Sequence, residues 1–250
     1  MLRDLRPLRR HLRTILAVAG STLRPACRAA PLALLALLAA CARPLTGAEV
    51  ALLAPLHGPT FNPAPVRIHR TPGIDAFPIT YDARPRTTCR ERIAPLDPRP
   101  RITARTAGIV LFQRLFVSPD LALPDYAAED DTGALPLPLA MFFVHEMTHV
   151  WQWQNRRLTG YHPARAFLEQ ATVDDPYLFE EGMPRFLDYG FEAQASLVEE
   201  YLCCATLDPS GARTSRLHAL LRQVMPAARP ETFPRRVSVP YGRELGGICS

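Results

Sequence analysis

The chain has 250 residues and a formal net charge of +5 at pH 7. Residues 1–40 contain seven Arg and one Asp, so this segment carries +6 and the remaining chain carries −1. Because the basic character is confined to the N-terminal segment, the composition gives no support to a nucleic-acid partner. About 210 residues beyond that segment suit one domain with a sizeable core.

The N-terminal segment has the pattern of a lipoprotein signal peptide. A basic stretch precedes the apolar run 31–40, which is shorter than the roughly 20 residues that a membrane-spanning helix needs. The run ends in Leu38-Ala39-Ala40-Cys41, a bacterial lipobox in which Cys41 becomes the lipidated first residue. The alternative is ordinary cleavage near this point. We therefore predict a signal peptide over 1–40 and a lipid-anchored protein of the outer membrane that faces the periplasm.

The first half of the remaining chain predicts a short helix and a small sheet. Residues 46–49 form a capping box, Thr-Gly-Ala-Glu, so a helix is expected to begin there. Residues 66–70 alternate in polarity and predict a strand. Residues 106–112 and 114–117 predict two further strands, joined as a hairpin. The acidic, turn-rich segment 120–133 is expected to be a surface loop.

A long apolar segment over 135–157 carries the pattern HExxH, formed by His145, Glu146 and His149. On a helix the two histidines lie on one face, one turn apart, where both can bind the same Zn²⁺. Glu146 projects about 100° around the helix from His145, so it can lie beside the metal without binding it. This spacing predicts that Glu146 is the general base for the attacking water.

A catalytic zinc needs a third protein ligand, and the sequence offers three candidates. The extension HExxHxxGxxH is absent, because Gln152 and Asn155 replace its Gly and its third His. Glu192 is the preferred ligand, since it lies in the first turn of a helix predicted from about residue 191, where the helix dipole favours a carboxylate. Asp188 is the next candidate, and a purely structural role for Glu192 is also open. His162 ranks lower, because it follows the first helix too closely in the sequence to return to the site.

The rest of the chain predicts smaller elements. Residues 177–186 are expected to form a small hairpin, and residues 215–225 a short helix. Residues 226–250 are rich in Pro and Arg and are expected to form a loosely ordered tail. These assignments place the domain with the zinc site at residues 41–225.

Four cysteines remain after Cys27 and Cys41, and an even number in an exported chain permits disulfides. Adjacent Cys203 and Cys204 are not expected to bond each other, because the linking peptide would be strained. One of them can pair with Cys89 or with Cys249. Alternatively, they are small buried apolar residues on the second helix.

Two segments resemble a bacterial family of Vgr-related, gluzincin-like zinc metallopeptidases associated with contractile injection systems. They are the run from Phe143 to Gln152 and the run Asp188 to Tyr201, which reads DYGxExQAxxVxxY. Residues 43–49 also resemble the opening of that family, so the likeness covers roughly residues 43–205. The resemblance implies a zincin fold and a zinc site with Glu192 as a ligand.

We therefore expect an α+β, zincin-like single domain with an HExxH helix, a small sheet and a second helix that carries a ligand. His145, His149 and Glu192 are expected to bind Zn²⁺, with Glu146 as the catalytic base. The expected substrate is a polypeptide or the peptide part of the cell wall. The alternative is an inactive, zinc-stabilised accessory or binding module of a secretion or injection system.

Overall fold

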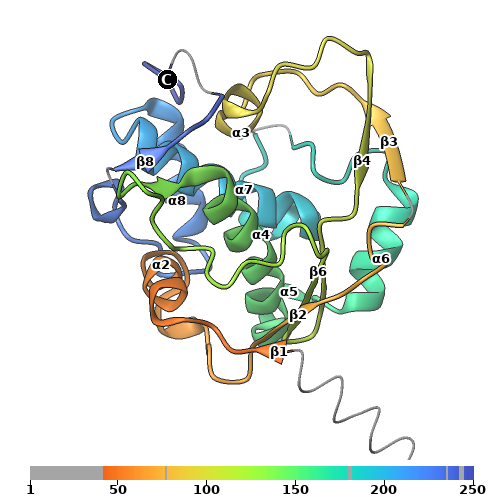
Figure 1. The fold of residues 1–250 in the computed structure, drawn as a ribbon. Coiled ribbons are helices and arrows are strands. Elements are labelled where there is room, and N and C mark those ends of the chain that lie inside the picture. Colours follow the sequence, from red (N-terminus) through yellow and green to blue (C-terminus); the bar gives the residue numbers. More distant parts are fainter. Residues whose placement is uncertain (1–41, 77, 180–181, 235, 242–244) are drawn as a thin grey trace, which may run out of the picture. The chain divides into compact units, whose positions relative to one another are not determined.

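A computed structural model describes residues 42–250 except 77, 180–181, 235 and 242–244 (Figure 1). The predicted signal peptide and its lipidation site, Cys41, lie outside the described residues. From Arg43 to Ser250 the chain forms one compact unit. Among the described helices, none has both the length and the apolar character needed to cross a membrane.

The described residues form helices and small sheets, which confirms the α+β class. The helices are α2 (Gly47–His57), α3 (Cys89–Ile93), α4 (Leu137–Gln154), α5 (Arg156–Thr159), α6 (Pro163–Thr172), α7 (Phe191–Leu207) and α8 (Ala212–Leu221), with short 3-10 turns at Gly58–Thr60, Phe186–Asp188 and Pro230–Thr232. The strands are β1 (Ala42–Arg43), β2 (Arg67–Arg70), β3 (Pro78–Asp82), β4 (Arg101–Arg105), β5 (Gly108–Leu111), β6 (Arg114–Val117), β7 (Leu135–Pro136) and β8 (Val237–Ser238).

The main sheet has the strand order β1-β2-β6-β5. The predicted hairpin is confirmed, since β5 and β6 are antiparallel and Val110 pairs with Leu115. β2 runs parallel to β6, with Ile68 opposite Leu115. This arrangement leaves β5 at the edge of the sheet, and β5 packs against α4.

Helix α2 begins where the capping box predicts. The backbone N–H of Glu49 donates to Thr46 Oγ1 at 3.0 Å, and that of Thr46 donates to the Glu49 carboxylate at 2.9 Å. Arg43 pairs with the same carboxylate at 2.7 Å, so one buried Glu joins β1 to the start of the helix. Burial of this carboxylate is thus matched by several donors, as a buried charge requires.

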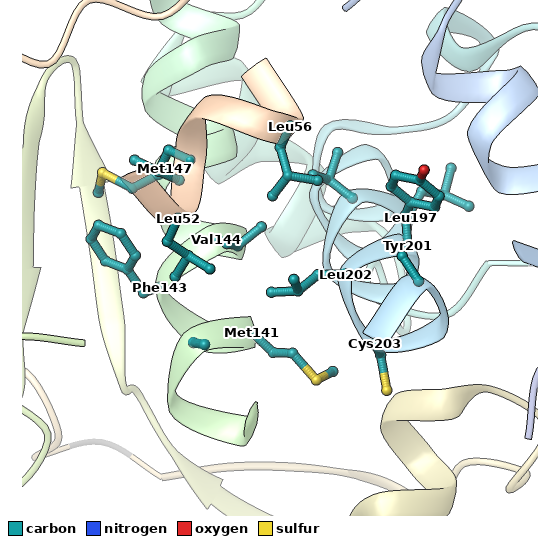
Figure 2. Packing of buried hydrophobic residues seen from close by; sticks show 14 of the residues in the cluster. Leu52, Leu56, Met141, Phe143, Val144, Met147, Leu197, Tyr201, Leu202 and Cys203 are labelled. Atoms are coloured by element: carbon teal, nitrogen blue, oxygen red, sulfur yellow. The ribbon is translucent and has the colours of Figure 1, made fainter. Parts of the chain in front are cut away.

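Helix α4 lies at the centre of the hydrophobic core and packs against α7 (Figure 2). Met141 and Val144 of α4 face Leu202 of α7, and α2 brings Leu52 and Leu56 against them. Most residues of α4 are buried, which explains why the helix is mainly apolar and carries a single acidic residue, Glu146. Because α4 and α7 are closely packed, the side chains at the contact between them are held in fixed positions.

The C-terminal segment departs from the expected loose tail. β8 pairs in parallel with β7, which directly precedes α4, and Cys249 forms a disulfide with Cys204 of α7. A second disulfide joins Cys89 of α3 to Cys203. The two adjacent cysteines therefore pair with different partners, which resolves the alternatives that the sequence left open.

Three further segments differ from the predictions. The described residues of 177–186 contain turns and no strand, so the hairpin predicted there was wrong. Helix α6 and the two-stranded sheet β3–β4 were not predicted. β4 does alternate in polarity, as Arg-Ile-Thr-Ala-Arg, but neither strand has a fully buried residue and their pairing spans a long connection that contains α3.

Candidate metal centre

Three side chains that were predicted to bind metal converge in the structure. His145 and His149 lie one turn apart on α4, and Glu192 comes from the first turn of α7. Nε2 of each histidine lies 3.1 Å from the same atom, Oε2 of Glu192. All three residues are buried, and their ligand atoms lie within 4.8 Å of one another.

His145 is oriented by a second carboxylate on α7. Its Nδ1 lies 3.1 Å from Oε2 of Glu199, two turns along the helix from Glu192. Arg90 of α3 donates to the same oxygen at 3.3 Å. Because Nδ1 is engaged by Glu199, Nε2 of His145 is the nitrogen that faces Glu192, as in the carboxylate–histidine pairs that support metal sites.

His149 is oriented by an amide. Its Nδ1 lies 2.8 Å from Oε1 of Gln152, while Nε2 of Gln152 donates to the Phe191 carbonyl and to Gln194, both at 3.0 Å. These two acceptors fix which end of the amide faces the ring, so Nδ1–H of His149 donates to Oε1. The Nε2 lone pair of His149 is thereby left for a ligand role.

Helix α6 holds Glu192 in place. Gln170 donates to Oε1 of Glu192 at 2.7 Å, and this leaves Oε2 for the two histidines. Glu169 accepts from the backbone N–H groups of Phe191 and Glu192, at 2.9 and 3.1 Å, and so caps the start of α7. A Cβ at Gly190 would lie 2.7 Å from Glu169 Oε1, which explains the glycine before the helix.

The charges at this site favour a cation among the three side chains. Burial by itself lowers the pKa of His145, but Glu192 and Glu199 outweigh it and raise the pKa to about 10. Burial likewise opposes a charged His149, and the charge of Glu192 raises its pKa above the usual range. Burial raises the pKa of Glu192, yet the two histidines hold it well below its usual value.

The residues present fit a metal ion. Metal–ligand bonds of about 2.0–2.1 Å at tetrahedral angles place neighbouring ligand atoms roughly 3.3 Å apart, close to the two 3.1 Å separations. Two imidazoles and one carboxylate also form a common ligand set for a catalytic divalent metal with one open position. The three residues therefore form a group that could hold a metal ion.

Glu146 lies beside this group and is not part of it. Burial raises the pKa of its carboxyl group, and the charges of His145 and His149 act in the opposite direction. A Cβ at Gly108, the first residue of β5, would lie 3.0 Å from Oε1 of Glu146. The carboxylate thus packs against the backbone of the edge strand, and a larger residue at position 108 would crowd it.

Two tyrosines cover the histidines. The ring of Tyr177 lies 5.8 Å from that of His145, and the ring of Tyr161 lies 5.9 Å from that of His149. Tyr177 accepts from Gln170 at 3.1 Å. Burial raises the pKa of both phenols, so both remain proton donors at neutral pH.

The other sequence candidates lie elsewhere. Asp188 pairs with Arg185 at 2.7 Å and is outside the metal-binding group, and the exposed His162 caps α6. Glu199, Gln170 and Tyr177 were not predicted as parts of the site. The signal for Glu199 is its spacing of seven residues from Glu192, because two helical turns return a side chain to the same face.

Comparison with known proteins gives one structural likeness. No family model matches the chain, and no curated protein matches it. Among solved structures, the effector domain of Pseudomonas aeruginosa VgrG2b is similar, with 22% sequence identity and a TM-score of 0.40. The similarity covers 72% of this chain and 80% of that chain.

Proposed function

We propose that this protein is a zinc-dependent metallopeptidase with a zincin-like fold. The observation that carries the proposal is a buried carboxylate, Glu146, beside three buried side chains that could hold a metal ion. A purely structural metal site is closed by a fourth protein ligand, and among the described residues none joins His145, His149 and Glu192. A structural site also has no use for Glu146.

The ligand set supports zinc as the metal. Two neutral imidazoles and one carboxylate suit Zn²⁺, whereas Mg²⁺ and Ca²⁺ prefer oxygen ligands alone. Bound there, zinc would lower the pKa of water to about 7 and polarise a carbonyl group. His145 and His149 would offer Nε2, since each Nδ1 is already engaged.

The side chains around the ligands would carry the proton transfers. Glu146 would accept the proton of the attacking water and pass it to the leaving amine. A raised pKa suits this role, because the group must both accept and release a proton near neutral pH. Tyr161 and Tyr177 are protonated and lie over the two histidines, where a phenol could donate to a developing oxyanion.

The edge strand β5 supports a polypeptide substrate. It begins at Gly108, against Glu146, and its outer edge has no neighbouring strand in the four-stranded sheet. An extended peptide could pair with this edge and pass over Glu146. We propose envelope polypeptides or cell-wall peptides as substrates, in keeping with the predicted signal peptide and the predicted lipid anchor at Cys41.

Glu146→Gln tests the function. The amide has nearly the shape of the carboxylate but cannot accept the proton, so we expect zinc content and thermal stability to be retained while hydrolysis falls by about 10²–10⁴-fold. Zinc is measured by elemental analysis, and hydrolysis by mass spectrometry of new termini in an envelope protein extract.

The matched control is Glu129→Gln, the same change at an exposed position, which should leave hydrolysis unchanged. Hydrolysis that survives Glu146→Gln would assign the base to another residue. No cleavage by the zinc-loaded wild type would favour the accessory-module alternative.

A further inference from the structure

Helix α6 is oriented with its polar side chains inward and its apolar side chains outward. Glu169 and Gln170 face α7 and the metal group, and Ala166 is the one buried residue of the helix. Phe167 and Leu168 are 75% and 61% exposed, although they are the largest apolar side chains of α6. An amphipathic helix normally buries its apolar face, so this face is suited to a partner or a surface outside the domain.

Three arginines lie on α5 and α6, close to this apolar face in the sequence. Arg156 and Arg157 lie on α5, next to Leu158, which is 53% exposed, and Arg165 lies on α6. All three arginines are exposed, and the sequence from 155 to 168 contains no acidic residue. Exposed apolar side chains among basic ones are typical of segments that lie on anionic membranes.

Aromatic side chains continue the surface at the start of α6. Phe112, at the tip of the β5–β6 hairpin, lies 4.7 Å from Trp153 and 6.1 Å from His162, which caps α6. The guanidinium of Arg156 lies 4.5 Å from the Trp153 ring. Phe112 is exposed and has a left-handed backbone, with φ of 61°, so this ring is held outward at a tight turn.

We infer that α5 and α6 form a membrane-binding surface, with Phe167, Leu168 and Leu158 inserted among lipids and the three arginines at anionic headgroups. The positive charge of the arginines favours an anionic membrane over a second copy of the chain as the binding partner. A two-fold contact would bring two copies of the same basic patch together, and the repulsion between them would oppose dimerisation. An anionic bilayer instead matches both the charge and the apolar side chains. The inference goes beyond the proposed function, and it requires neither metal nor hydrolysis.

Trp153 offers a local test. The chain has two tryptophans, and Trp151 is fully buried, so changes in emission on contact with lipid report Trp153. The full chain is mixed with phosphatidylcholine vesicles that contain or lack phosphatidylglycerol. Quenching by brominated lipid is then measured together with vesicle co-sedimentation. We expect quenching with the anionic vesicles, and its loss at high salt, because ions screen the arginines.

Two sets of variants separate the contributions. Phe167→Ser with Leu168→Ser should lower partitioning at least about tenfold. Arg156→Gln, Arg157→Gln and Arg165→Gln together should lower it further on anionic vesicles, since each arginine contributes about fivefold there. Leu96→Ser is the matched control, since Leu96 is also highly exposed but lies far from α6 in the sequence.

Each variant keeps the same N-terminal segment, so a contribution of residues 1–41 to binding is equal throughout. Melting curves check that the variants are folded. Unchanged quenching in the Phe167/Leu168 variant would overturn the inference. A second result would also overturn it: wild type that does not bind vesicles but forms a dimer in light scattering, with the Phe167/Leu168 variant monomeric. A second copy of the chain would then be the occupant.

Discussion

Two regions contribute to the candidate metal centre, and they are held in place by different interactions. One is the helix pair α4–α7, and the other is the segment from α6 to Tyr177. α4 and α7 carry all three candidate ligands and are held by buried apolar side chains and by disulfides at Cys203 and Cys204. α6 buries only Ala166 and is attached by polar contacts through Glu169 and Gln170. The ligand positions are thus set by packing, whereas the cover over them is set by a few hydrogen bonds that can exchange with water.

The largest effect is expected from His149→Ala, which removes a ligand from the rigid pair. Metal affinity should fall far more than the 10–100-fold that loss of a supporting residue costs. Elemental analysis and competition with a chelating dye measure it. His162→Ala removes a nearby histidine that is exposed and should retain the metal. Equal metal content in both variants would show that α4 does not carry the site.

Substitution of one leucine in each region tests how much its side chain contributes to the free energy of unfolding. Leu202 of α7 is 0% exposed, and Leu202→Ala should lower the free energy of unfolding by about 2–5 kcal/mol. Leu168→Ala on α6 should change it by less than about 0.5 kcal/mol, because that side chain is already in solvent. Urea unfolding of the two variants measures the difference. Similar losses would mean that the outer face of α6 is packed.

Two adjacent residues of α7, Glu199 and Glu200, are expected to have different roles. Glu199 supports metal binding, and Glu200 supports the stability of the fold. Glu199→Gln weakens the hydrogen bond to His145 and should reduce metal affinity by about tenfold, at the lower end of effects of this kind. Glu200 accepts from the backbone of Cys89 and Arg90, so Glu200→Gln should lower stability and leave metal affinity unchanged. Isothermal titration and thermal melting of both variants distinguish the two roles.

The smallest effect is expected from Gln170→Ala, which removes the contact between α6 and Glu192. Metal affinity should fall by less than about tenfold, since the 2.7 Å bond competes with water at a partly exposed position. Thr172→Ala, on the same helix, is the control. A loss as large as that of Glu199→Gln would mean that the cover is as firmly fixed as the helix pair.

The sequence predicted those parts of the site that depend on local spacing. HExxH defines both the helix and the common face of His145 and His149, and the turn at Gly190 places Glu192 at a helix start. Gln170 and Tyr177 could not be predicted in the same way. Their roles depend on how α6 packs, and its apolar face points outward, so the pattern that reveals most helices gives no guide to its orientation.

The same difference between local and long-range features applies to the fold. The capping box at Thr46 and the β5–β6 hairpin are local and were predicted correctly. The pairing of β7 with β8 joins residues about a hundred positions apart, and two-residue strands carry no periodicity of their own. Proline and arginine in the last 25 residues suggested a loose tail, whereas the Cys204–Cys249 disulfide and a hydrogen bond from Tyr201 to the Ala228 carbonyl attach this segment to α7.

The two adjacent cysteines of α7 have a consequence for oxidative folding. Sulfur atoms of Cys89, Cys204 and Cys249 lie within 4.8 Å of one another, although they belong to two different disulfides. A thiolate released by reduction of one bridge therefore lies close to a sulfur atom of the other, which it can attack. Partial reduction would yield interconverting pairing isomers on one folded scaffold, and the isomer that frees Cys249 would lack the covalent link between α7 and the end of the chain.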